Sequence, residues 1–357
     1  MAYTTIDDPS AYFHTQLYTG DGASTNAITN DANAGDFQPD WIWIKRRDGA
    51  DNHHLFDTSR GITKELNTNG TGGEGSGTNL VKSSDTDGFT LGDNGGVNGS
   101  SETYVAWQWI ANGGTTSSNT SGDITTTVQA NTTAGFSILT YTGTGTAGDT
   151  IGHGLGAVPS LFIIKRRSGT EDWVVYHHKN TSAPETDHLL LNTTDATSDS
   201  DTRFNDTAPT STLITLGNNA VVNASSSTYV GYAFTEKQGY SKFGSYTGNG
   251  NADGPFIYTG FKPAWVMIKL TSSTENWIMM DNKRDTFNNA YRTLLANASS
   301  AEDTSNDARY SLDFVSNGFK VRSNAHATSN GNGSTYIYMA FAEHPFVSSK
   351  GAPTTAR

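Results

Sequence analysis

The chain has 357 residues, of which 34% are hydrophobic and 16% are charged, and its formal net charge is −12. The acidic balance argues against a protein whose main task is to grip nucleic acid, and the absence of cysteine excludes disulfide frameworks and cysteine-based zinc sites. No apolar run reaches the length of a membrane span, and an aromatic content of 11% argues against a disordered chain.

The N-terminal segment, residues 1–15, is short and aromatic. It has no basic region followed by an apolar stretch, so we expect no secretory signal. After it, three units share one pattern and fill the chain to residue 347. Each unit is as long as a whole small domain, too long for a solenoid repeat.

Every unit has the same landmarks. It opens with Tyr-Thr-Gly, carries a Lys six residues after a Pro, and closes with an Asn six residues before a Tyr. The landmarks are the opening tyrosines Tyr18, Tyr141 and Tyr246, the lysines Lys45, Lys165 and Lys269, and the closing pairs Asn98/Tyr104, Asn223/Tyr229 and Asn330/Tyr336.

The first unit, residues 16–112, shows β signals. The run Trp41–Arg47, a turn-rich stretch and then His54–Asp57 predict a hairpin. Because neighbours on a strand point to opposite faces, the two tryptophans at 41 and 43 lie on one face and the isoleucines between them on the other. We expect one face in the unit's own core and the other against a neighbouring module or chain. Stacking of sugars on the tryptophans is the less favoured alternative.

The later boundaries follow from composition. Residues 113–134 are rich in Thr, Ser, Asn and Gly and are expected to form a linker or exposed loop. The second unit spans residues 135–236, the third spans 237–347, and 348–357 form a C-terminal tail. The segments Trp173–His177 and Trp277–Asp281 are expected to be the returning strands of the later hairpins, and the best helix candidate is Asn288–Leu295.

The fold class that these signals predict is all-β. Short runs rich in Trp, Ile, Val, Tyr and Phe alternate with Gly, Asn, Asp and Ser clusters, which favours antiparallel two-sheet sandwiches or jelly rolls. We therefore expect three tandem β-sandwich modules in series.

A family resemblance rests on specific phrases of the sequence. Repeat modules of phage proteins, especially from phages of marine bacteria, resemble Phe261-Lys-Pro-Ala-Trp-Val-Met-Ile-Lys269, Asp313-Phe-Val-Ser-Asn-Gly-Phe-Lys320 and Tyr336-Ile-Tyr-Met-Ala-Phe-Ala-Glu-His-Pro-Phe346. Another such module is similar to Asp87-Gly-Phe-Thr-Leu-Gly92 with Tyr104-Val-Ala-Trp-Gln-Trp109. The resemblance covers nearly the whole chain and implies concanavalin-like sandwiches in tail fibres or other virion surface proteins.

Several histidines and acids are candidate ligands or catalysts. Within the pairs His53-His54 and His177-His178 the side chains point to opposite faces, so we expect one partly buried and one solvated member rather than a metal site. His153 lies in a glycine turn. Asp85, Asp87 and Asp93 are expected to be turn residues, with calcium as the alternative.

Charged clusters invite further hypotheses. Lys45-Arg46-Arg47 and Lys165-Arg166-Arg167 are expected to be solvated strand ends, with a patch for anionic polysaccharide as the alternative. The matched pairs Asp57/Arg60 and Asp281/Arg284, replaced by His177 and Asn180 in the second unit, predict exposed ion pairs of modest value.

The function expected is that of a phage virion structural protein, not an enzyme. We expect a tail fibre or host-attachment protein that binds a surface glycan, made in the host cytoplasm and carried on the virion. Residues 1–15 would dock it there. The modules would form a rigid rod or a decorated surface, with a homotrimer, other virion proteins and a host-surface polysaccharide as partners and neither nucleic acid nor membrane among them.

Two alternatives remain beside this expectation. The first is a capsid-surface fibre or decoration protein. The second is a polysaccharide depolymerase, which would need acids gathered in a groove, drawn from Asp57, Asp281, Glu302 and Glu343. In the leading interpretation the chain has no catalytic, cofactor-binding or metal-binding residues and no cofactor.

Overall fold

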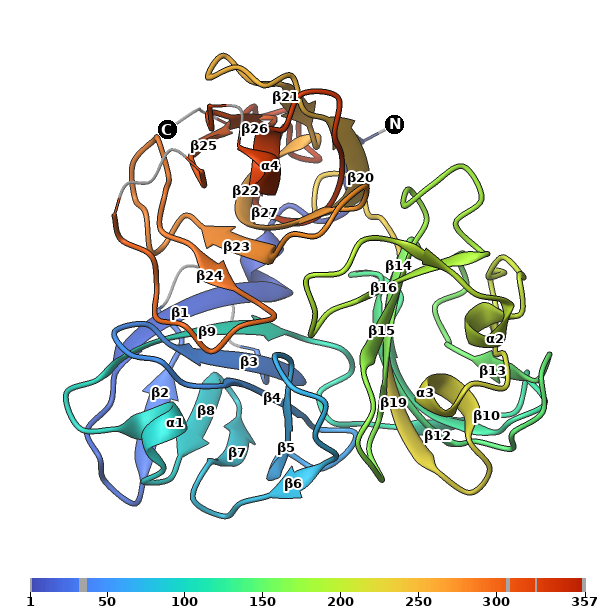
Figure 1. Ribbon diagram of the computed structural model, residues 1–357. Helices are drawn as coiled ribbons and strands as arrows, with labels where there is room; N and C mark the ends of the chain where they lie inside the picture. The colour runs from blue at the N-terminus through green and yellow to red at the C-terminus, as the bar shows by residue number, and fades with distance from the viewer. Residues whose placement is uncertain (1, 32–36, 306–308, 325, 355–357) are drawn as a thin grey trace.

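The computed structural model describes residues 2–31, 37–305, 309–324 and 326–354. It is mostly β, with 42% strand and 6% helix in several antiparallel sheets. Figure 1 shows three lobes around a common centre: a first lobe in blue and cyan, a second in green and yellow, and a third in orange and red. They contain strands β1–β9, β10–β19 and β20–β27, respectively.

The first lobe has a main sheet in the order β1-β9-β3-β4-β5-β6 and an outer sheet in the order β2-β8-β7. Its elements are η1 (Pro9–Ala11), β1 (Phe13–Thr19), β2 (Asn26–Thr29), β3 (Trp41–Arg46), β4 (His53–Asp57), β5 (Lys64–Asn67), β6 (Gly75–Ser76), β7 (Val81–Asp85), β8 (Gly88–Leu91), α1 (Gly95–Asn98) and β9 (Thr103–Trp109).

The second lobe has a main sheet in the order β10-β11-β12-β19-β14-β15-β16-β17 and the outer pair β13-β18. Its elements are β10 (Ser117–Asn119), β11 (Thr126–Asn131), β12 (Phe136–Thr142), β13 (Thr150–Gly152), β14 (Leu161–Arg166), β15 (Trp173–His177), β16 (Asp187–Leu190), β17 (Ser198–Asp199), α2 (Asp201–Phe204), β18 (Leu213–Thr215), α3 (Ala220–Asn223) and β19 (Thr228–Phe234).

The third lobe has a main sheet in the order β20-β27-β22-β23-β24 and an outer sheet in the order β21-β26-β25. Its elements are β20 (Ser241–Thr247), β21 (Phe256–Tyr258), β22 (Phe261–Leu270), β23 (Trp277–Asp281), β24 (Leu294–Leu295), β25 (Leu312–Val315), β26 (Gly318–Val321), α4 (Ala327–Asn330) and β27 (Thr335–Pro345). The predicted hairpins are confirmed as β3–β4, β14–β15 and β22–β23.

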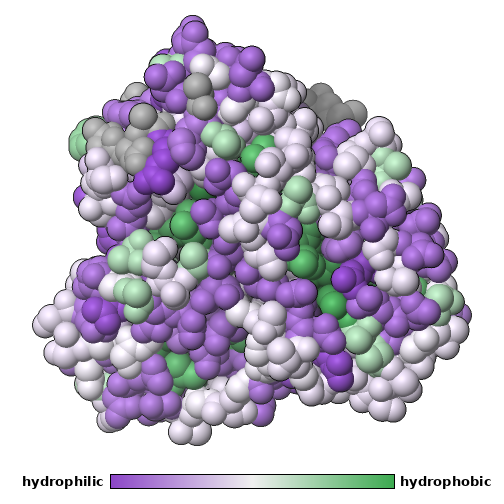
Figure 2. Space-filling model, in the orientation of Figure 1, coloured by the Kyte–Doolittle hydropathy of each residue, from purple (hydrophilic) through white to green (hydrophobic). Residues whose placement is uncertain are grey.

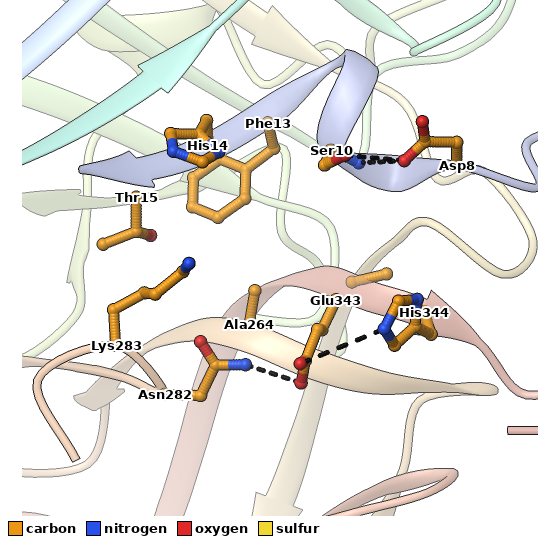
Figure 3. Close-up of a pocket in the computed structure, with 11 residues that line it drawn as sticks. Asp8, Ser10, Phe13, His14, Thr15, Ala264, Asn282, Lys283, Glu343 and His344 are labelled. Atoms are coloured by element: carbon orange, nitrogen blue, oxygen red, sulfur yellow. Dashed lines mark hydrogen bonds and ion pairs between the residues drawn. The ribbon is translucent and has the colours of Figure 1, made fainter. Parts of the chain in front are cut away.

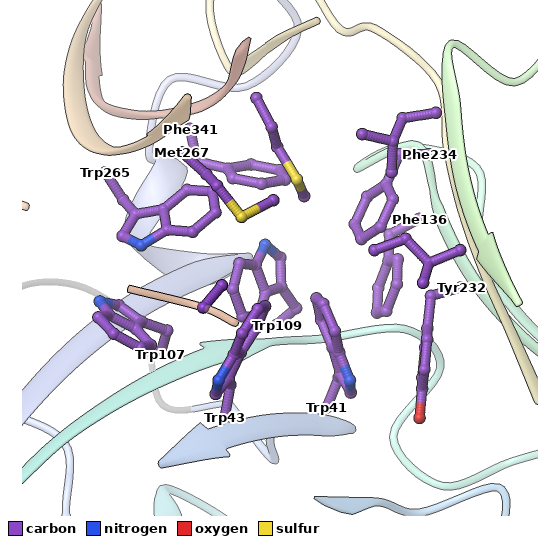
Figure 4. Packing of buried hydrophobic residues seen from close by; sticks show 14 of the residues in the cluster. Trp41, Trp43, Trp107, Trp109, Phe136, Tyr232, Phe234, Trp265, Met267 and Phe341 are labelled. Carbon is purple, nitrogen blue, oxygen red and sulfur yellow. The ribbon is translucent and has the colours of Figure 1, made fainter. Parts of the chain in front are cut away.

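One apolar core is shared by all three lobes (Figure 4). Its ring contacts cross every boundary: Trp41 stacks on Tyr232 with centroids 4.8 Å apart, and Trp109 meets Trp265 at 5.8 Å. The third boundary is closed by Phe234 and Phe341 at 6.0 Å. A buried indole removes roughly 150–250 Å² from water, so this core holds the lobes together. The expected rod of modules in series is therefore wrong, because the main sheets face a common centre.

The tryptophan strand β3 is buried on both faces, as predicted. Trp41 and Trp43 belong to the shared core, whereas Ile42 and Ile44 belong to a separate cluster with the outer sheet of the first lobe. All five tryptophans considered as sugar platforms are at most 1% exposed, which contradicts that alternative: Trp41, Trp43, Trp107, Trp109 and Trp265.

The repeat motifs have a structural explanation. In each lobe the opening tyrosine stacks on the closing one, with centroids 5.1, 5.0 and 4.8 Å apart. The closing Asn ends the short helix α1, α3 or α4 and binds loop backbone on both sides; Asn98, for example, donates to the Gly92 carbonyl at 2.8 Å and accepts from the Asp21 amide at 3.1 Å. The motifs therefore fix one corner of each lobe.

Two local predictions are corrected. The segment Asn288–Leu295 is not helical: Ala290 pairs with Leu312, and the segment ends in β24. Within residues 113–134 the expected linker contains β10 and β11, and β11 extends the second main sheet beside β12. No helix among the described residues is long and apolar enough to cross a bilayer.

Both ends of the described chain lie on the third lobe (Figure 1). Ile6 enters the shared core at 2% exposure, and the Thr4 hydroxyl donates to the Gln238 carbonyl at 2.7 Å. The Ser349 amide donates to Asp7 at 2.6 Å. The N-terminal segment is therefore packed against the body of its own chain.

Candidate functional site

The junction between the first and second lobes contains a chain of alternating charges. Asp57, at the end of β4, accepts hydrogen bonds from the Arg60 side chain and from the Tyr232 hydroxyl at 2.6 Å. Arg60 Nη1 lies 3.2 Å from Glu74 Oε2, and Arg167 of the second lobe binds both oxygens of Glu74 at 2.7 and 3.1 Å. The Asp57 and Arg60 side chains are 0% exposed, so the two charges are paired out of contact with water.

The junction between the third and first lobes repeats this arrangement. Asp281 accepts from Arg284 Nε at 2.6 Å and from Trp107 Nε1 at 3.1 Å. Arg284 Nη1 lies 3.1 Å from Glu302, and Arg47 of the first lobe binds both Glu302 oxygens at 2.9 and 3.0 Å. Both predicted Asp–Arg pairs therefore exist, but they are buried and bound to a partner lobe, which corrects the expectation of exposed pairs.

The junction between the second and third lobes uses neutral groups at the same positions. His177 Nε2 donates to the Tyr338 carbonyl at 3.2 Å. Asn180 accepts from the Thr197 hydroxyl at 2.7 Å, and the Thr197 amide donates to the Thr271 carbonyl at 3.0 Å. This backbone bond corresponds to the Glu74–Arg167 and Glu302–Arg47 bonds of the charged junctions, each 2.8 Å long.

The second lobe has His177 in place of the aspartate, because the third lobe offers no side-chain hydrogen-bond donor opposite it. On the last strand of each lobe, Trp107, Tyr232 and Met339 occupy equivalent positions. Trp107 and Tyr232 donate to a carboxylate, whereas the thioether of Met339 has no hydrogen to donate. A buried charge that loses its partner costs about 3–5 kcal/mol, so the complete charged set is replaced together.

Residues of the two basic clusters bind partners within the chain. Lys165 Nζ donates to the carbonyls of Thr71 and Glu171 at 2.9 and 2.7 Å. Lys45, Lys165 and Lys269 are 0% exposed, and burial lowers the pKa of each to about 8. The arginines that end each cluster bind glutamates across the charged junctions, so the clusters form no open cationic patch. The middle arginines, Arg46 and Arg166, stay partly exposed and pair with Glu102 and Glu171, so the expected solvated strand ends are found only for these two residues.

The first histidine pair is buried on both sides of its strand. His53 is 0% exposed and accepts from Trp43 Nε1 at 2.8 Å, and burial holds its pKa well below the ordinary value. Burial also disfavours charge on His54, but its bonds to Asp51 and Glu65 outweigh burial and raise its pKa. The expectation of one solvated member is therefore wrong for this pair.

The other histidines have structural partners. His177 is 1% exposed, and burial lowers its pKa to about 3. His178 is half-buried, with its Nε2 2.7 Å from the Phe243 carbonyl oxygen, so the expected solvated member is not found in this pair either. His153 is buried, and its Nε2 lies 3.2 Å from the Thr210 carbonyl oxygen. These contacts leave the three side chains in packing and hydrogen-bonding roles.

The candidate acids are dispersed. Asp85 accepts from the Thr90 hydroxyl at 2.7 Å in the β7–β8 hairpin, where Asp87 forms the turn and Asp93 follows. In the part of the chain that the structure describes, no group of three or more histidines and acids is placed to hold a metal ion. Three of the four acids weighed for a depolymerase are buried in the junctions: Asp57, Asp281 and Glu302.

Glu343, the fourth acid, lines a pocket of about 240 Å³ between the N-terminal segment and the third lobe (Figure 3). His14 lines the opposite wall, and burial lowers its pKa. Asn282 Nδ2 donates to Glu343 at 2.6 Å, and Lys283 completes the polar lining. The pocket therefore mixes amide, acidic and basic groups, and Asp8 of the N-terminal segment is a second carboxylate in its lining.

A family model described as a domain of unknown function, DUF7483, matches residues 8–345. The chain belongs to the DUF7483 family. Because the match spans all three lobes, the DUF7483 unit is the whole three-lobed body. No curated protein and no solved structure matches the chain.

The residues that sequence reasoning missed in this DUF7483 chain are the partners across the junctions: Glu74, Arg167, Tyr232, Arg47 and Trp107. A signal existed for them. The residue two after the landmark lysine is Arg47, Arg167 or Thr271, and it is a threonine only opposite the lobe that has lost its Asp–Arg pair. Comparing the repeats as neighbouring surfaces would have revealed this pattern.

Proposed function

We propose that this protein is a phage virion structural protein, a tail-fibre or host-attachment component that binds a surface glycan and performs no catalysis. The observation that carries the proposal is the use of the candidate acids and cations. The lobes bind one another through Asp57, Asp281, Glu302 and residues of both basic clusters. A structural role therefore accounts for these charged groups. The resemblance of the repeats to phage surface modules supports the same class.

Each lobe is proposed to be a concanavalin-like two-sheet sandwich. The support is a private apolar layer between the main and outer sheets of each lobe, separate from the shared core. A homotrimer would present each outer face three times, and weak sites on repeated faces gain strength through multivalent binding.

Its place on the particle is proposed to be the tail. The support is the resemblance of the repeats to modules of phage tail fibres and other virion surface proteins.

The test is cryo-electron microscopy of the parent particle with an antibody against this chain, together with competition of phage adsorption by the purified protein. Label at the tail and reduced adsorption are the expected results. Label spread over the capsid would make the protein a decoration protein instead. Release of reducing sugar from host capsule by the purified wild-type chain would overturn the non-enzymatic part, and loss of that activity in Glu343→Gln would locate the site.

A further inference from the structure

Two aromatic rings stand exposed on the third lobe. Phe256 and Tyr258 are 49% and 54% exposed, while Ile257 between them is buried in the core of that lobe. They lie on β21, the edge strand of the outer sheet, two residues apart and hence about 6.6 Å apart along the strand. On the face drawn in Figure 2, by contrast, hydrophobic residues lie mainly in recesses and the rims of the lobes are hydrophilic or neutral.

The fold does not require these rings, because the other lobes lack them at the same positions. Ile28, Ile151 and Ile257 pair with the equivalent inward residues of the neighbouring strands. The residues that flank each isoleucine are Ala27 and Thr29 in the first lobe, Thr150 and the buried Gly152 in the second, and the exposed Phe256 and Tyr258 in the third. Packing thus leaves the two rings unexplained, and exposed apolar groups of this kind mark binding surfaces.

Contacts at the edges of the rings hold them in place. The Tyr258 hydroxyl lies 3.1 Å from that of Tyr3, which itself donates to the Gly260 carbonyl at 2.8 Å. Phe256 lies over Gly318, where an added Cβ would come within 3.2 Å of the ring. Rings that are already ordered lose little conformational entropy when a ligand binds.

The charges beside the rings are balanced. Lys320, directly opposite Phe256, is paired with Asp253, and Arg322 binds Asp313 at 2.6 Å. Two cations and two carboxylates leave no net charge to attract a polyanion. They also offer donors and acceptors around an apolar platform, the composition of sites for small polar ligands.

We propose that the outer sheet of the third lobe binds a neutral glycan, with Phe256 and Tyr258 stacking on the apolar faces of its sugar rings. The rim formed by Lys320, Asp253 and Arg322 would hydrogen-bond the hydroxyl groups. This inference rests on the proposed function, since it names the site and the class of glycan through which attachment would occur.

The experiment measures binding of the whole chain to an array of neutral oligosaccharides, namely gluco-, manno-, galacto- and chito-hexaoses, with alginate and hyaluronan hexamers as acidic probes. The test variant is Phe256→Ala/Tyr258→Thr, which installs the residues that the first lobe already carries at these positions. Phe287→Ala is the matched control, because it removes an exposed ring elsewhere on the third lobe. Thermal unfolding checks that each variant is folded.

The expected result is binding of at least one neutral probe, lost about tenfold or more in the double variant and unchanged in Phe287→Ala. Equal binding by the double variant would overturn this site and leave glycan attachment intact. Binding of acidic probes alone, or of none, would overturn the neutral-glycan proposal, while the location on the particle is tested independently. A wild-type dimer that the double variant abolishes would identify the rings as a contact between copies and also overturn it.

Discussion

Two kinds of junction hold one body together. The first–second and third–first junctions each link a fully buried Asp–Arg pair, through a glutamate of the same lobe, to a partly exposed arginine of the neighbouring lobe. In the third–first junction Arg292 also binds the glutamate. The second–third junction, with the same backbone bonds, uses His177, Asn180 and two threonines. The three interfaces therefore share a geometry and differ in chemistry.

The difference teaches that buried charges at these junctions come as complete sets. A carboxylate without its guanidinium, or a guanidinium without its second acid, would be left in a dry interface, where an unpaired ion is far more costly than a neutral group. The set itself gives little net stability over neutral or apolar packing. The charges therefore serve to specify which surfaces meet, and the shared apolar core supplies the driving force.

The largest effect is expected from breaking one charged set. Arg284→Met leaves Asp281 and Glu302 buried without their common partner, and we expect a loss of about 3–5 kcal/mol in the free energy of unfolding. Urea denaturation measures it. The matched control is Arg46→Met, which removes a partly exposed pair with Glu102 and should cost about 0–1 kcal/mol. Equal losses in the two variants would contradict the contrast between buried and surface pairs.

Acid should weaken the second–third junction through His177. Burial holds the pKa of folded His177 at about 3, below the ordinary 6.5, so the unfolded chain binds more protons between these values. The contribution of neutral His177 to the free energy of unfolding is complete above pH 6.5. Below that pH it decreases by about 1.4 kcal/mol for each unit by which the pH is lowered. Glu74 and Glu302 also have lowered pKa values: burial opposes the shift, and their arginine partners outweigh it. Their contribution is therefore lost only below the ordinary value of 4.5.

The measurement is urea unfolding of the wild type and of His177→Gln at several pH values between 7.5 and 5. Below pH 6.5 the wild type should lose stability more steeply, by about 1.4 kcal/mol per pH unit relative to the variant, and above it the two profiles should be parallel. The other buried histidines, such as His53, titrate in both proteins and cancel in the difference. Profiles that stay parallel below pH 6.5 would show that His177 is not held neutral at the junction.

The sequence predicts the hairpins and the buried strands of this protein, but not the packing of the three lobes around a shared core. Alternation on β3 predicted a strand buried on two faces, because the period of two assigns Trp41 and Ile42 to opposite sides. Local patterns could not show that the second face belongs to a core shared by all three lobes, since that depends on contacts between distant residues. Asp57 and Arg60 were visible as a pair, but their burial depends on Tyr232 and Glu74, which no local rule connects to them.

The smallest loss of stability for a change within a junction is expected from a variant with five substitutions. The first–second junction can be converted to the neutral chemistry by Asp57→His, Arg60→Asn, Glu74→Thr, Arg167→Thr and Tyr232→Met. We expect this variant to lose less than about 2 kcal/mol, because every buried charge leaves together with its partners and the fold already accepts these residues at the second–third junction.

The control for the converted junction is Arg60→Met alone, which strands Asp57 and should cost about 3–5 kcal/mol. Urea denaturation of both variants decides between two accounts of the interface. If the five substitutions together cost less stability than Arg60→Met alone, their energies are coupled. The complete charged set then adds little net stability to the junction. If the converted variant instead loses the sum of its single substitutions, each charge stabilises the junction separately, and the second–third junction is then the weakest of the three.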